Sequence, residues 1–283
     1  MSTAPLDRTV EVVLRDGLVL RGWEAGSGEP LLLVHGFTGS VEAWGLSLLE
    51  ELSLRYRVIA VDLPGHGASG GPRDPDRYSM SEILGDLREL LDHAGIDAAT
   101  WIGYSMGGRV AFAASLEMPE RVSRVVLESA SPGLETASAR AHRRNEDGRL
   151  ALDLETGGID RFVAQWLALP LFESQQRLSA EVRESARRRR LTGDALAWAA
   201  CLRGLGTGSQ PSYWDRLDFV MCPTLLLTGI DDPKFSALGA RMAGSIPGAV
   251  HVVIDGAGHQ VHLEAPDTWL SHVQSFLDKA SAS

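Results

Sequence analysis

The chain has 283 residues, of which 44% are hydrophobic, and a formal net charge of −10 at pH 7. This length is sufficient for a large buried core, in one domain with an elaboration or in two small domains. An acidic chain is poorly suited to binding nucleic acid or an anionic membrane surface, so we expect neither as a partner.

No targeting or membrane segment is predicted. The N-terminal stretch MSTAPLDRTVEVVLRDG carries acidic residues and a proline where a signal peptide would need an apolar run. No run approaches the roughly 18 apolar residues of a membrane span. Cys201 and Cys222 lack CxxC spacing and a histidine-rich neighbourhood, which argues against a metal site. We therefore expect a cytoplasmic protein with two buried free thiols, no metal and no cofactor.

Short apolar runs predict a β-sheet. Residues 10–20 alternate between apolar and polar around Asp16-Gly17, which predicts an antiparallel hairpin. Helical patterns separate most of the runs that follow, notably at 81–93, 105–117 and 263–279. This alternation predicts a mostly parallel sheet with helices on both faces. The predicted strands, each typical of burial on both faces, are 31–35, 58–62, 99–103, 125–129, 224–229 and 250–255.

One long interval, residues 131–216, contains no strand pattern and is rich in Arg, Glu, Ala and Leu. Loop signals at 131–133 (SPG) and 210–212 (QPS) bound it. We predict a core in two parts, 1–130 and 217–283, with 131–216 as a helical cap. The cap holds 13 arginines and 11 acidic residues, whereas the rest of the chain has a net charge of −12. Chance and a lid that meets an anionic ligand are both open interpretations.

A serine motif lies between a strand and a helix. Gly103-Tyr104-Ser105-Met106-Gly107 matches G-x-S-x-G, directly after one strand run and at the start of a helical pattern. Such a tight turn holds the serine hydroxyl above the sheet, and the glycines relieve the crowding around it. The helix N-terminus places a positive dipole near any developing anion. We therefore predict that Ser105 is catalytic.

A serine hydroxyl needs a partner that takes its proton. His259, in GAGHQVH, follows the last strand run, and Asp231 and Asp232 follow the run before it. The order Ser, Asp, His, each just beyond a strand, is that of the α/β-hydrolases. We predict His259 as the base, while the pattern leaves both aspartates open as its partner. His262 is interpreted as a helix-cap or surface histidine.

Two main-chain N–H groups are expected to form an oxyanion hole. One belongs to Met106, directly after the serine, and the other to Phe37, in the HGF loop after the 31–35 run. The glycine-rich stretch DLPGHGASG (62–70) lies next to this site. It is not interpreted as a phosphate loop, because GxxxxGK[ST] is absent.

Eight segments occur in an order that is seen in one enzyme family: HGFTGS, DLPGHGAS, GYSMGGRVA, SPGL followed by Arg140 and Arg143, PLFESQQRL, GTGSQPSYWDRL, DDPKF and GAGHQVHLEAP. Over nearly its whole length the chain resembles the MenH family, the 2-succinyl-6-hydroxy-2,4-cyclohexadiene-1-carboxylate synthases. HGF, DLPGHG and GAGH are common to many α/β-hydrolases, whereas GGRVA, the PGL-plus-arginines segment, GSQPS and D-x-KF are more specific. The resemblance implies an α/β-hydrolase fold with a helical cap inserted between two strands.

The resemblance also implies a lyase. In D-x-KF the family's carboxylate lies two residues before the lysine, which is Asp232 here; Gln260 departs from the Asn or Thr of some relatives. The family's substrate, 2-succinyl-5-enolpyruvyl-6-hydroxy-3-cyclohexene-1-carboxylate, carries three carboxylates. A proton α to the succinyl ketone is removed and pyruvate leaves. By this resemblance Ser105 acts as the general base through His259, the oxyanion hole holds an enolate oxygen, and no acyl-enzyme forms.

Arginines suit such a substrate, because a guanidinium pairs with a carboxylate through two hydrogen bonds. Arg109 lies four residues after Ser105 on the same helix face, and helical side chains lean toward the N-terminus, so it can reach back toward the serine. The resemblance implies Arg143 as a second clamp and a third in the run 187–190. Matching the segments on either side leaves Arg187 and Arg190 both open. By itself the run is typical of a solvated helix face.

Tyr104, Trp166 and Phe172 are expected as cavity walls, with an ordinary core role equally open for the last two. The main alternative function is a carboxylesterase or C–C bond hydrolase of the same fold, which would have an apolar lid without arginines directed at the serine. A non-catalytic ligand receptor is a further alternative, against which the complete triad argues. We expect a small-molecule polycarboxylate substrate, and either a monomer or a homodimer.

Overall fold

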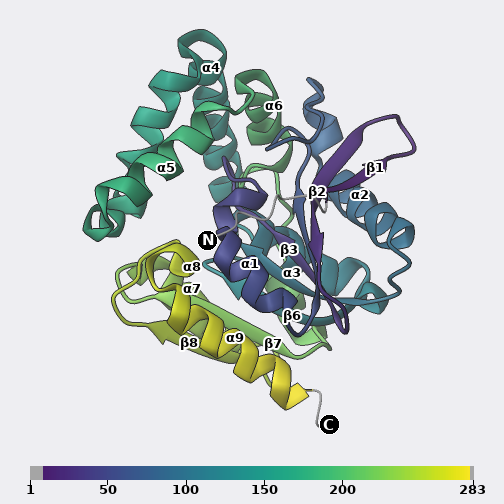
Figure 1. The fold of residues 1–283 in the computed structure, drawn as a ribbon. Helices are drawn as coiled ribbons and strands as arrows, with labels where there is room; N and C mark the ends of the chain where they lie inside the picture. The colour runs from purple at the N-terminus through teal and green to yellow at the C-terminus, as the bar shows by residue number, and fades with distance from the viewer. Residues whose placement is uncertain (1–8, 281–283) are drawn as a thin grey trace.

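The computed structural model describes residues 9–280, so part of the N-terminal stretch considered above lies outside the described residues. Eight strands form one sheet in the order β1-β2-β4-β3-β5-β6-β7-β8 (Figure 1). The predicted hairpin is confirmed: β1 (Thr9–Val13) and β2 (Val19–Ala25) are antiparallel, and β2 is also antiparallel to β4. All other neighbouring strands are parallel.

The six predicted strands are all present. They are β3 (Pro30–Val34), β4 (Arg57–Asp62), β5 (Ala99–Tyr104), β6 (Val122–Glu128), β7 (Thr224–Gly229) and β8 (Val250–Ile254). The prediction of burial on both faces is wrong for β8, where Val250 is 50% exposed and Val253 43% exposed. The reason is position: β8 is an edge strand of the sheet, with a neighbouring strand on one side only.

Helices cover both faces of the sheet. One face packs α1 (Leu46–Ser53), α8 (Val261–Glu264) and α9 (Pro266–Ala280) against Leu31 and Leu33 of β3. The other packs α2 (Met80–His93), α3 (Met106–Glu117) and α7 (Pro233–Ala243) against Leu32 and Val34. Because successive strand residues face opposite sides, this alternation buries β3 from Leu31 to Val34. The two layers confirm the predicted class of fold.

Helices also fill the long interval between β6 and β7. We call α4 (Ala137–Leu167), α5 (Ala180–Leu191) and α6 (Ala195–Leu205) the cap helices. A break at Gly158, with φ of +74°, interrupts α4. Two 3₁₀ segments complete the interval, η4 (Pro170–Arg177) and η5 (Trp214–Phe219). The cap helices lie together beyond one end of the sheet (Figure 1, top). The division of the chain at 130 and 216 stays a prediction.

The cap helices have a small hydrophobic cluster of their own, formed by Ala151, Leu154, Phe162, Val163, Trp198, Ala199 and Leu202. Phe37, from the loop after β3, packs against this cluster as well as against the main core. The loop that follows β3 is therefore held between the sheet and the cap helices, and its conformation depends on both.

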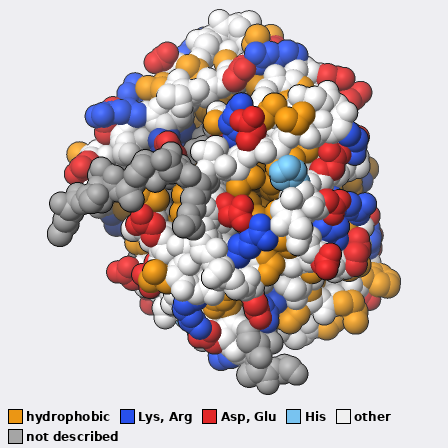
Figure 2. All heavy atoms as spheres, turned by 45° about the vertical axis from the view of Figure 1, so that its right-hand side comes forward, with side chains coloured by type: hydrophobic (Ala, Val, Ile, Leu, Met, Phe, Trp, Pro, Cys, Tyr) orange, Lys and Arg blue, Asp and Glu red, His pale blue; other side chains and the backbone are white. Residues whose placement is uncertain are grey.

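The surface carries many charges. On the face shown in Figure 2, basic and acidic side chains lie interspersed. Several arginines pair with exposed carboxylates, for example Arg216 with Glu117. Such exposed pairs contribute little to stability, about 0–1 kcal/mol each. Within residues 9–280, no helix combines the length and apolar character that crossing a membrane requires.

Candidate active site

Ser105 occupies the sharp turn between β5 and α3. Its φ is +52°, a conformation that residues other than glycine rarely adopt. Its main-chain N–H donates to the carbonyl oxygen of Glu128 at 2.8 Å. A Cβ on Gly103 would lie 2.3 Å from the Gly107 carbonyl oxygen, and one on Gly107 only 2.0 Å from that of Val34. The turn therefore requires both glycines of the motif, because only a residue without Cβ fits these positions.

A chain of hydrogen bonds connects residues from the ends of three strands. The Nε2 atom of His259 lies 3.0 Å from Ser105 Oγ, and its Nδ1 lies 2.7 Å from Asp232 Oδ2. The carboxylate accepts only, so Nδ1 carries the proton and Nε2 accepts from the serine hydroxyl. His259 is 1% exposed and Asp232 is 6% exposed. This arrangement lets the imidazole take the proton of the serine hydroxyl.

The two neighbouring aspartates have different partners. Asp232 caps the N-terminus of α7, where its Oδ1 accepts the N–H of Phe235, while Oδ2 binds His259. The exposed Asp231 pairs with Arg177 of η4 instead. Only Asp232 is in contact with the imidazole, so it is the carboxylate that can fix the tautomer.

Two main-chain donors lie beside the serine. Met106 is the first residue of α3, so its N–H has no acceptor within the helix. Phe37 N–H makes no hydrogen bond within residues 9–280. Both residues line the same cavity as Ser105. Free N–H groups placed in this way can donate to an oxygen that gains negative charge.

A cavity of about 480 Å³ opens above Ser105, between the sheet and the cap helices. Apolar side chains that include Trp166, Leu171, Leu205 and Phe235 form much of its wall. The indole N–H of Trp166 and the hydroxyl of Ser129, which also lines the cavity, have no hydrogen-bond partner within the described residues. Both atoms are buried, so these two polar groups remain unpaired in the cavity wall.

Arg109 is a buried cation without an anionic partner. It is 8% exposed and donates to Gln210 Oε1 at 2.6 Å and to the carbonyl oxygen of Leu205 at 2.9 Å, both neutral acceptors. Burial lowers its pKa to about 10, so it stays protonated at neutral pH. A buried charge is costly unless it is paired. An anionic ligand would supply the missing charge.

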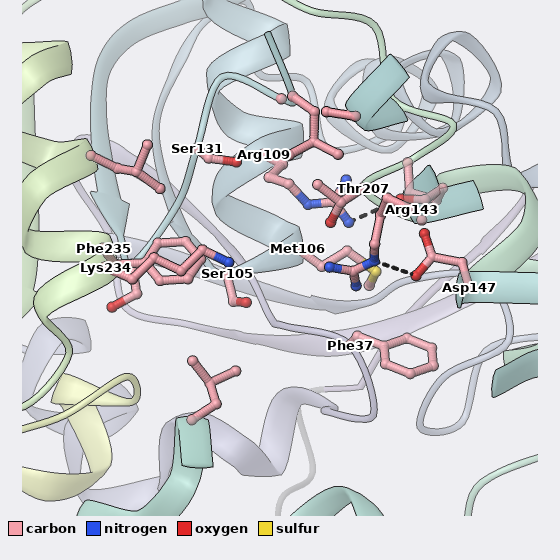
Figure 3. A pocket seen from close by; sticks show the side chains of 18 of the residues that line it. Phe37, Ser105, Met106, Arg109, Ser131, Arg143, Asp147, Thr207, Lys234 and Phe235 are labelled. Carbon is pink, nitrogen blue, oxygen red and sulfur yellow. Dashed lines mark hydrogen bonds and ion pairs between the residues drawn. The ribbon is translucent and has the colours of Figure 1, made fainter. Parts of the chain in front are cut away.

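Arg143 lies beside Arg109 in the cavity, and its Nε donates to Asp147 Oδ1 at 2.7 Å (Figure 3). The buried Asp147 carboxylate also accepts the N–H of Gly208. The two guanidinium charges repel, which contributes to the lowered pKa of Arg109. A single carboxylate therefore compensates two cations on this side of the cavity.

Six charged residues line the cavity wall, and the sequence analysis named only Arg109 and Arg143 among them as site residues. The cations that line it are Arg109, Arg143, Lys234 and Arg241, and the anions are Glu135 and Asp147. Arg241 pairs with Glu135 and stacks on Trp214, with its Cζ atom 3.9 Å from the ring centroid. Lys234 was visible in the DDPKF motif, and Asp147 in its spacing of four residues from Arg143. Nothing in the sequence indicated Arg241.

The structure separates the two alternatives in the arginine run. Arg187 has a side chain that is 44% exposed and pairs with Glu184 on its own helix. Arg190 is 7% exposed and donates to Thr38 Oγ1 at 3.1 Å. Neither belongs to the residues that line the cavity above Ser105. Arg187 therefore lies on the exposed side of α5, whereas Arg190 points to the loop after β3.

The aromatic residues that were expected as cavity walls occupy different positions. Trp166 lines the cavity. Tyr104 does not line it: its buried ring packs against His259 and His262, with centroids 5.5 and 5.0 Å away. Phe172 is 4% exposed and packs between Trp166 and His259. Tyr104 and Phe172 therefore support the imidazole and the cavity wall from behind.

The interpretation of His262 as a cap or surface residue is wrong. Its ring is fully buried, and Nδ1 lies 2.8 Å from the carboxylate of Glu128 at the end of β6. Its Nε2 lies 3.0 Å from Gln260 Nε2, and Gln260 in turn accepts from Gln175 of η4. The sequence does not indicate the pair of His262 and Glu128, because the two residues are 134 positions apart.

We expect Glu128→Gln to lower the free energy of unfolding by about 1.5–3 kcal/mol, the contribution of a hydrogen bond to a charged group. The amide keeps the shape of the side chain but loses the charge that faces His262. Denaturant titration measures the change. Glu117→Gln, at the exposed pair with Arg216, is the control and should change it by about 0–1 kcal/mol. Equal losses in the two variants would contradict a stabilising buried pair.

The fold and the Ser-His-Asp geometry together define an α/β-hydrolase. Residues 29–266 match the family described as alpha/beta hydrolase fold. A protein of Bacillus subtilis (strain 168), provisionally named 2-succinyl-6-hydroxy-2,4-cyclohexadiene-1-carboxylate synthase, is 38% identical over 95% of this chain and 98% of its own. The structure of MenH from S. aureus is 34% identical, with a TM-score of 0.88 over 93% of this chain and 98% of that one. Within the α/β-hydrolases, this chain belongs to the MenH family.

A solved hydrolase is also similar. The malate-bound thermophilic esterase of Thermogutta terrifontis is 30% identical, with a TM-score of 0.80 over 96% of this chain and 98% of that chain. The same scaffold therefore carries an esterase as well as a MenH protein.

Proposed function

We propose that this protein is a lyase that eliminates pyruvate from 2-succinyl-5-enolpyruvyl-6-hydroxy-3-cyclohexene-1-carboxylate to give 2-succinyl-6-hydroxy-2,4-cyclohexadiene-1-carboxylate, a step of menaquinone biosynthesis. Its substrate is a free small molecule, which is consistent with a cytoplasmic enzyme. The observation that carries the proposal is the buried Arg109, without an anionic partner, in the same cavity as Ser105.

In the proposed reaction, Ser105 Oγ removes the proton α to the succinyl ketone while its own proton moves to His259 Nε2. Asp232 stabilises the resulting imidazolium through Nδ1–H. The ketone becomes an enolate, whose oxygen accepts from the N–H groups of Phe37 and Met106. The electron pair then shifts through the ring and the C–O bond to the enolpyruvyl group breaks. His259 then gives its proton to the leaving enolpyruvate, which becomes pyruvate, while Ser105 keeps the proton that it took from the substrate. No bond forms between Ser105 and the substrate.

The arginines supply binding and orientation. Arg109 and Arg143 would each pair with a substrate carboxylate, since a guanidinium matches a carboxylate with two parallel hydrogen bonds. Lys234 and Arg241 extend the positive lining on the side of α7. Four cations against two carboxylates suit a substrate with three negative charges better than a neutral ester.

The test is the release of pyruvate from the purified intermediate. We expect stoichiometric pyruvate and the cyclohexadiene product, with no substrate-derived mass on Ser105 in rapid-quench mass spectrometry. The serine and the oxyanion hole suffice for slow hydrolysis of activated aryl esters, so weak esterase activity is compatible with this function. An adduct on Ser105 that forms and decays at the turnover rate would contradict proton abstraction.

The second candidate is a carboxylesterase or C–C bond hydrolase. The hydrogen-bonded Ser105, His259 and Asp232 favour it, because this arrangement also serves nucleophilic attack. A hydrolase acting on a neutral ester would not supply an anionic partner for the buried charge of Arg109. Absence of pyruvate release together with rapid hydrolysis of a simple ester would establish this alternative.

A further inference from the structure

The turn that carries Phe37 is held in a strained conformation. Thr38 has a φ of +63°, which is unfavourable for a β-branched residue, and is 3% exposed. A Cβ on the preceding Gly36 would lie 3.4 Å from Ser105 Cβ, so the turn lies directly against the serine. Strained residues keep their conformation only where the surroundings fix it.

One side of the turn is fixed by the sheet. The carbonyl oxygen of Gly36 accepts from His35 Nδ1 at 2.7 Å and from the N–H of Gly39 at 3.0 Å. Burial lowers the pKa of His35 to about 4, so the ring is neutral and its Nε2 accepts the N–H of Leu63. These bonds hold the ends of the turn, but none of them reaches Thr38.

The other side is fixed from the cap helices. Arg190 of α5 is almost fully buried, and its Nε donates to Thr38 Oγ1 at 3.1 Å while Nη1 donates to the carbonyl oxygen of Ala186 at 2.9 Å. Both acceptors are neutral, and no carboxylate pairs with Arg190 among the described residues. Arg190 is not among the residues that line the cavity, and among the described residues Thr38 is its hydrogen-bond partner outside its own helix.

We infer that Arg190 is a positioning residue: from the cap helices it holds Thr38, and through Thr38 it sets the direction of the Phe37 N–H in the oxyanion hole. This inference rests on the proposed role of Phe37 N–H but not on the identity of the substrate, since a lyase and an esterase would both use that donor. It also gives Arg190 a different role from the carboxylate clamp implied by the family resemblance.

The experiment measures how fast Ser105 reacts with an uncharged alkyl fluorophosphonate. This reaction uses the serine, the histidine and the oxyanion hole, but the probe has no carboxylate. Thr38→Val removes only the hydroxyl, and valine has the same branching at Cβ, so the backbone cost is matched. We expect Thr38→Val and Arg190→Ala each to slow the reaction by about 10- to 100-fold, as for the loss of one hydrogen bond to a charged group.

Four comparisons make the result decisive. The double variant should be no slower than the slower single variant, because both changes break the same contact. Thr38→Ser, which restores the hydroxyl, should react at nearly the wild-type rate. Arg188→Ala, an exposed arginine on the same helix that pairs with Glu184, is the matched control and should leave the rate unchanged. With the tricarboxylate substrate, Thr38→Val should lower kcat more than it raises KM.

A wild-type reaction rate for Thr38→Val would overturn the inference, even if Arg190→Ala failed to fold. So would a loss for Arg190→Ala that appears only in KM for the tricarboxylate, because a carboxylate clamp predicts that pattern. Neither outcome bears on pyruvate release by the wild-type protein, so failure of the inference and failure of the proposed function are separable.

Discussion

Replacing Ser105 or His259 with alanine, or Asp232 with asparagine, is expected to lower the rate of pyruvate elimination by about 10²–10⁴-fold. Each change interrupts the hydrogen-bonded chain from Oγ through the imidazole to the carboxylate. Asparagine is chosen at 232 because it still caps α7, so the loss reports the charge and the tautomer of His259 and not the helix. Thermal unfolding should show that all three variants remain folded.

The matched control is Asp231→Asn. This neighbouring carboxylate pairs with Arg177 at the surface and does not contact the imidazole. We therefore expect a much smaller effect on turnover. If Asp231→Asn were the more damaging change, the assignment of Asp232 as the partner of His259 would be wrong.

Arg109→Ala is expected to lower kcat/KM for the tricarboxylate substrate by about one to two orders of magnitude, since a hydrogen bond to a charged group contributes roughly 1.5–3 kcal/mol. A neutral aryl ester has no carboxylate to lose, so its hydrolysis should fall much less. Arg109→Lys should restore part of the loss, because an ammonium group cannot form the bidentate pair. Steady-state kinetics of the same variants on the two substrates gives the comparison.

Arg143→Ala should show the same selectivity for the anionic substrate, because its guanidinium lies in the same cavity beside Arg109. Arg149→Ala, an exposed arginine on the same cap helix, is the control and should behave as wild type. Equal losses on the anionic and neutral substrates would mean that Arg109 and Arg143 maintain the cap helices, and the lyase proposal would lose its main physical support.

The sequence by itself determined the sheet and the positions of Ser105 and His259. Alternating and continuous apolar runs identify strands because side chains in a strand face opposite sides with a period of two. The glycines at 103 and 107 can be recognised from the sequence because they belong to a short local motif, and contacts of 2.0–2.3 Å show that neither position accommodates a Cβ. The order of strand ends then brings the serine and the histidine to one edge of the sheet.

Only the tertiary structure decided which of several similar residues meet. Asp231 and Asp232 are adjacent, yet one reaches Arg177 and the other His259. Arg187 and Arg190 share a helix, but its rotation sends one to solvent and buries the other against Thr38. The partners are 27 to 152 residues apart in the chain. Local sequence patterns fix the path of the backbone over a few residues, whereas these contacts depend on how whole helices are rotated and docked on the sheet.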